Sequence, residues 1–100
     1  MKYRFHPAAI DEFQEAASYY HAHNSQLSAR YIAAVEDAIS RIVEAPRRWP
    51  VIDEDVRRCR TRVFPYGILY TLESDHVLIL AVMHSSREPG TWKKRTPNPP

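Results

Sequence analysis

The chain has 100 residues, which suits one domain with a modest core, and its 44% apolar content argues against disorder. No apolar run approaches the roughly 20 residues of a membrane span, and the first residues lack a stretch of signal-peptide length. Cys59 is the one cysteine, which excludes an internal disulfide, so we expect a cytoplasmic protein without membrane contact. The net charge is only +2, but residues 46–100 carry ten Lys or Arg against six Asp or Glu. This excess predicts a basic surface and an anionic partner.

The first half of the chain predicts a strand followed by a helical hairpin. Residues 2–6 alternate between aromatic and polar side chains, which is typical of a short strand. Pro7 can occupy the first position of a helix over residues 8–22. After a turn, Ser25 is a suitable N-cap for a second amphipathic helix, which Pro46 ends near Ala45.

The second half predicts a loop and three strands. Residues 46–55 are expected to form the loop, and residues 57–63, 67–73 and 77–84 the strands. The last of these is apolar on both faces, as expected of a central strand. The element order is β-α-α-β-β-β, an α+β fold with the hairpin on one face of a small, mainly antiparallel sheet and the first strand beside the last. We expect one domain over residues 1–95 and a disordered Pro-rich tail over residues 96–100.

Three arginines follow one another at strand spacing. Arg58, Arg60 and Arg62 are two residues apart, so a strand over residues 57–63 would place them on one face. Such a stripe binds phosphate or carboxylate groups, although charge can also simply protect the edge of a sheet. Cys59, on the opposite face, is expected to be a buried structural thiol.

The remaining chemically notable residues carry weaker signals. Trp49 is expected to pack on the core, and Trp92 fits either a core or an interface. His21 and His23 do not share a helix face, and no Cys or His follows at zinc-like spacing. We therefore expect no metal and no cofactor.

Four segments, in order, resemble the RelE/ParE toxin family. YRFHPAAIDEF (3–13) is similar to the family's first strand and helix start, and APRRWP (45–50) resembles its loop after the hairpin. RTRVFPYGILY (60–70) is similar to its R-x-F-P-Y-x-I-x-Y segment, and AVMHSSREP (81–89) to its last strand and turn. The resemblance implies the toxin of a type II toxin–antitoxin system, held inactive by an antitoxin from a neighbouring gene.

The family has two main branches, and the resemblance favours the ParE-like, plasmid-stabilisation branch. That branch inhibits DNA gyrase by binding, whereas the RelE-like branch cleaves messenger RNA on the ribosome. In the ribonuclease branch an arginine often stands where this chain has Gly67. The residues expected to bind the antitoxin or the target are Arg58, Arg60, Arg62, Arg87, Trp92, Lys93 and Lys94.

Two alternatives stay open. A ribosome-dependent endoribonuclease would use Arg60, Arg62, His84 and Arg87, with His84 as acid or base and the arginines stabilising the phosphorane-like transition state. A non-toxic nucleic-acid-binding module is the weaker alternative, because the arginine stripe lacks neighbouring aromatic rings on which bases could stack.

Overall fold

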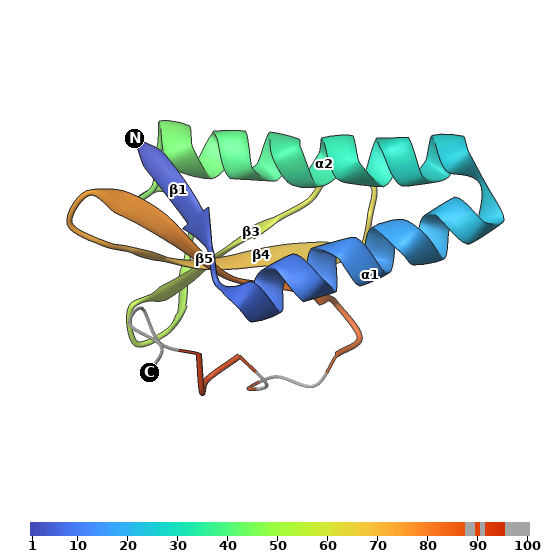
Figure 1. Ribbon diagram of the computed structural model, residues 1–100. Coiled ribbons are helices and arrows are strands. Elements are labelled where there is room, and N and C mark those ends of the chain that lie inside the picture. Colours follow the sequence, from blue (N-terminus) through green and yellow to red (C-terminus); the bar gives the residue numbers. More distant parts are fainter. Residues whose placement is uncertain (88–89, 91, 96–100) are drawn as a thin grey trace.

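The computed structural model describes residues 1–87, 90 and 92–95, so the predicted tail lies outside the described residues. Its elements are β1 (Lys2–Phe5), α1 (Pro7–His23), α2 (Ser25–Glu44), β2 (Val51–Asp53), β3 (Val56–Arg60), β4 (Tyr66–Leu72) and β5 (His76–His84). Both helices lie on one side of the sheet, and the chain after β5 returns along the other side (Figure 1). The predicted α+β fold is confirmed, with one strand more than expected. That strand, β2, lies within the predicted loop.

The helical hairpin begins and turns on side-chain caps. His6 is the N-cap of α1, where its Nδ1 accepts a hydrogen bond from the backbone of Ala8, and Pro7 follows as predicted. Asn24 closes α1 and also caps α2, because its Oδ1 accepts from the backbone N–H groups of Gln26 and Leu27 at 2.8 and 3.2 Å. The predicted N-cap at Ser25 is therefore wrong by one residue. Asparagine has the carbonyl oxygen that this cap requires.

The sheet has the strand order β1-β5-β4-β3-β2. β1 runs parallel to β5, beside which it was predicted, and the other neighbours are antiparallel. β5 has a bulge at Leu80, since Tyr70 pairs with Ile79 while Leu69 pairs with Ala81. Because of the bulge, Leu80 and Ala81 both join the apolar cluster on the sheet face away from the helices.

β3 ends at Arg60, three residues earlier than predicted. The reason is a tight loop held by Thr61, whose Oγ1 lies 2.6 Å from the carbonyl oxygen of Phe64 and 3.2 Å from that of Tyr66. Within this loop Val63 has a φ of 72° and is 91% exposed. The prediction that the strand continues as far as Val63 is therefore wrong.

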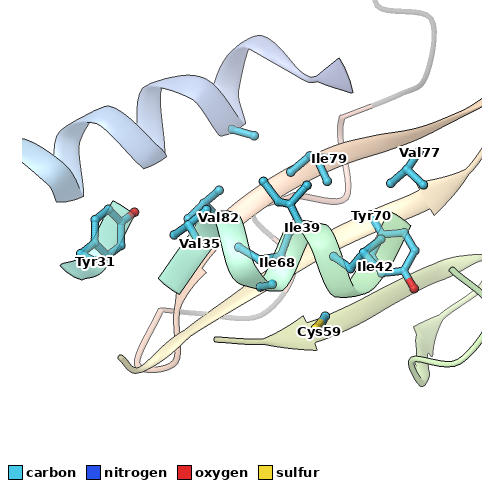
Figure 2. Packing of buried hydrophobic residues seen from close by; sticks show 12 residues of the cluster. Tyr31, Val35, Ile39, Ile42, Cys59, Ile68, Tyr70, Val77, Ile79 and Val82 are labelled. Carbon is cyan, nitrogen blue, oxygen red and sulfur yellow. The ribbon is translucent and has the colours of Figure 1, made fainter. Parts of the chain in front are cut away.

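The main core lies between α2 and the sheet. Figure 2 shows Val35, Ile39 and Ile42 of α2 directed toward Ile68 and Tyr70 of β4. Cys59 is fully buried in this cluster, as predicted, and burial raises the pKa of its thiol. Trp49 packs against the same cluster, and its Nε1 donates to the carbonyl oxygen of Arg41 at 3.3 Å, so its predicted packing role is confirmed.

Candidate functional site: a basic groove on the outer sheet face

The sheet face away from the helices, which we call the outer face, carries a second apolar cluster. Its buried members are Val56, Leu69, Leu78, Leu80, Ala81, Met83 and Trp92. Trp92, only 7% exposed, belongs to residues 92–95, which we call the C-terminal strap. The strap lies across the outer face because the indole packs on this cluster. Trp92 therefore contributes a buried ring to the site.

A groove of about 730 Å³ opens on this face beside the strap. Apolar side chains, among them Leu69, Met83 and Trp92, form part of its lining. The Asp, Arg, Lys and His residues that line it are Asp53, Arg58, Arg60, His84, Arg87 and Lys93. Four cations thus converge on one hollow with one carboxylate among the described residues, and an anionic group entering it would relieve their mutual repulsion.

Arg58 crosses the sheet over Gly67. A Cβ atom at position 67 would lie 3.0 Å from Cδ and 3.2 Å from Cγ of Arg58, which is too close for both to stay in place. Gly67 is buried and belongs to β4, whereas Arg58 belongs to β3 and pairs with Leu69. The glycine leaves this space open, because a Cβ would push the arginine stem aside by a few tenths of an ångström. Its effect is to let an arginine from the neighbouring strand lie where a side chain of its own would stand.

His84 ends β5 at the wall of the groove. Its Nδ1 accepts a hydrogen bond from the backbone N–H of Ser86 at 3.0 Å and lies 2.8 Å from the Ser86 hydroxyl. Since a backbone N–H can only donate, neutral His84 carries its proton on Nε2. The imidazole ring packs edge-on against Tyr66, with the two ring centroids 5.1 Å apart. Burial, together with the neighbouring Tyr20, raises the pKa of Tyr66 to about 12, so this phenol is neutral at physiological pH.

Not all predicted site residues reach the groove. Arg62 lies beyond the end of β3, is 71% exposed at its side chain, and approaches Asp37 of α2 at 3.9 Å. The prediction that it shares a face with Arg58 and Arg60 is therefore wrong, because the Thr61 loop redirects the chain. Lys94 is exposed and is not one of the residues lining the groove.

Sequence reasoning missed Glu12 and Arg95, which fix the strap to the rest of the fold. The Arg95 guanidinium donates to Oε1 and Oε2 of Glu12 at 2.8 and 3.0 Å, across 83 residues of sequence. A signal was present, since Glu12 stands on the same helical stripe as Ala9, Phe13 and Ala16. An acid on an apolar stripe needs a buried partner.

Two further findings concern metal binding and membranes. Among the described residues, no group of three His, Cys, Asp or Glu side chains is placed to hold a metal ion. In the same part of the chain, no helix combines the length and the apolar character needed to cross a membrane.

Known proteins match both the sequence and the fold. Residues 3–89 match the family model described as the ParE toxin of the type II toxin–antitoxin system parDE. Toxin ParE2 from two Mycobacterium tuberculosis strains, CDC 1551/Oshkosh and H37Rv, is 31% identical over 87 residues, covering 86% of this chain and 83% of the relative. A chain of the solved chromosomal ParDE TA system from P. aeruginosa has the same fold, with a TM-score of 0.63 at 13% identity over 84% of this chain and 95% of its own. This chain belongs to the ParE toxin family of type II toxin–antitoxin systems.

Proposed function

We propose that this ParE-type toxin acts by binding and inhibiting DNA gyrase, and that a cognate antitoxin neutralises it by occupying the basic groove. The observation that carries the proposal is the groove itself, where Arg58, Arg60, Arg87 and Lys93 surround a partly apolar lining. Such a surface suits a partner segment with carboxylates for the cations and aliphatic side chains for the lining. Membership in a toxin–antitoxin family supports an antitoxin as that partner.

The state of the titratable side chains supports binding over catalysis. A general base must have a free lone pair in its neutral form. The Nδ1 lone pair of His84 is already used by the Ser86 backbone N–H, and Nε2 carries the proton. Tyr66 is neutral at physiological pH, and burial raises its pKa to about 12, which makes the phenolate form that could accept a proton still rarer. Neither side chain in this arrangement is ready to remove a proton from a ribose hydroxyl, whereas a binding surface needs no such group.

The antitoxin contact is expected to depend on charge. A hydrogen bond to a charged group contributes about 1.5–3 kcal/mol, and replacing both Arg58 and Arg60 by Gln should weaken antitoxin binding by at least about 100-fold. The matched control is Arg30→Gln, which removes an exposed arginine from α2 on the other side of the molecule. Equal affinities of the double variant and the control would remove the groove from the interface.

The target is tested with purified toxin in two assays. We expect inhibition of gyrase supercoiling, reversal of that inhibition by the antitoxin, and intact messenger RNA in a translating extract. The Arg58→Gln/Arg60→Gln variant should lose potency in the supercoiling assay, whereas Arg30→Gln should keep it. Cleavage of ribosome-bound message with unaffected gyrase would overturn the gyrase assignment.

A ribosome-dependent endoribonuclease is the second candidate, because one specific observation favours it. Arg60, His84 and Arg87 line the same groove, and Arg58 lies over Gly67. A cation from the neighbouring strand thus lies beside the position where the ribonuclease branch often has an arginine. If this activity is present, His84→Ala should abolish message cleavage, and gyrase should remain active at toxin concentrations that stop translation.

A further inference from the structure

Glu12 is an acidic residue in a largely buried position. Its side chain is 10% exposed, and its carboxylate accepts hydrogen bonds from three N–H groups. Two come from the Arg95 guanidinium, and the third comes from the backbone of Val82 at 3.0 Å. Arg87 is a further cation nearby, with its Nη1 4.0 Å from Oε2 of Glu12. A carboxylate removed from water needs partners of this kind to remain charged.

Glu12 and Arg95 form a pair that completes the edge of β5 where β1 has ended. β1 pairs with β5 only as far as Phe5 and Ile79, and the bulge at Leu80 follows immediately. Beyond that point the Val82 N–H donates to Glu12, and the Leu80 carbonyl oxygen accepts from Nη1 of Arg95 at 2.8 Å. Two side chains therefore take the hydrogen bonds that a longer β1 would make.

The same pair holds the C-terminal strap. Arg95 is the last residue of the strap, and its side chain is 15% exposed. Trp92 packs into the outer-face cluster, and Nζ of Lys93 lies 3.5 Å from Oδ2 of Asp53 in β2. Trp92 and Lys93 both line the basic groove. The C-terminal strap thus forms one wall of the groove, and Glu12 is the charged residue that binds it to the rest of the fold.

We propose that Glu12 is a positioning residue for the basic groove: it lies outside the groove lining, and through Arg95 it holds the C-terminal strap that forms one wall. Its effect on the strap stands independently of the toxin's function, whereas its effect on antitoxin affinity rests on the proposed function. Loss of Glu12 leaves Arg95 without its carboxylate, and loss of Arg95 leaves Glu12 with the more distant Arg87 as its cation, so the strap detaches from the outer face more often.

The test compares Glu12→Gln, Arg95→Gln and the double variant in a Trp49→Phe background, where Trp92 is the remaining tryptophan. The control is Glu15→Gln, which removes an exposed carboxylate further along the same helix. We expect both single variants to shift Trp92 emission to longer wavelength. Trypsin cleavage after Lys93 and Lys94 should become at least about 10-fold faster. The double variant should release the strap no more than the single variants do, because it leaves no buried charge without a partner.

The outcomes distinguish the role of Glu12 in holding the strap from the proposed role of the groove in antitoxin binding. If Glu12→Gln and Arg95→Gln both behave like Glu15→Gln in emission and proteolysis, the positioning role is refuted. Arg95→Gln keeps this result decisive even if Glu12→Gln fails to fold, because Arg95 lies outside the helices and strands. Released straps together with weakened antitoxin binding, measured by calorimetry, are the expected result. Released straps with native affinity would leave the positioning of the strap standing and remove the groove from the proposed antitoxin interface.

Discussion

Gly67→Ala and Gly67→Val place increasing bulk beneath the side chain of Arg58. An Ala Cβ would lie 3.0 Å from Arg58 Cδ, so the arginine stem must move by a few tenths of an ångström. An off-rotamer side chain costs about 0.5–1.5 kcal/mol. Replacing glycine in a compatible strand conformation returns about 0.4–1 kcal/mol through the unfolded state. The stability of Gly67→Ala should therefore stay within about 1 kcal/mol of the native value.

The larger valine should displace Arg58 from the groove. Its additional methyl groups occupy the space that the arginine stem now fills, while a β-branched residue remains favourable in a strand. If Arg58 binds a carboxylate of the antitoxin, displacement should weaken binding by about 1.5–3 kcal/mol, or roughly 10- to 150-fold. The alanine variant should show a smaller part of this loss.

Calorimetric titration with the antitoxin and urea unfolding measure the two effects separately. The decisive control repeats both glycine substitutions in an Arg58→Ala background. There the crowding is absent, so neither substitution should change affinity further, and Gly67→Ala should now stabilise the fold by about 0.4–1 kcal/mol. Equal losses of affinity in both backgrounds would refute the idea that Gly67 acts by making room for Arg58.

Three further predictions concern the fold and the limits of the groove. Arg62→Gln should leave antitoxin affinity within about twofold, because exposed ion pairs such as the one with Asp37 contribute little; a loss like that of Arg58→Gln would extend the interface beyond the groove. Burial raises the pKa of Tyr70 to about 12, above its unfolded value of about 10, so its contribution to stability is complete below pH 10 and is lost as the pH approaches 12. In urea unfolding, Tyr70→Phe should reduce the loss of stability between pH 10 and pH 12 by roughly 3 kcal/mol. A pH profile identical to that of the native protein would contradict the raised pKa of Tyr70. Asn24→Ala should cost about 1 kcal/mol in thermal unfolding, whereas Ser25→Ala should be nearly neutral, and the reverse order would contradict the cap.

Local patterns in the sequence were sufficient for most of the secondary structure. Helix periodicity, Pro7 and Pro46 place both helices within a few residues, because capping and proline geometry act over short distances. The alternation of residues 67–73 and the continuous apolar run before His84 predict two of the strands for the same reason. The family resemblance likewise rests on four local segments, which follow one another in the family's order.

Only the tertiary structure determined the strand β2 and the contacts between charged residues. β2 has three residues and gains its strand geometry from pairing with β3, so its own composition is not informative. Arg62 leaves the expected face because the Thr61 hydroxyl closes a loop on carbonyl oxygens further along the chain. Gly67 and Arg58 lie on neighbouring strands, and Glu12 and Arg95 lie 83 positions apart. Sequence periodicity describes neighbours along one helix or strand, whereas a groove wall depends on long-range contacts that form only when the whole chain has folded.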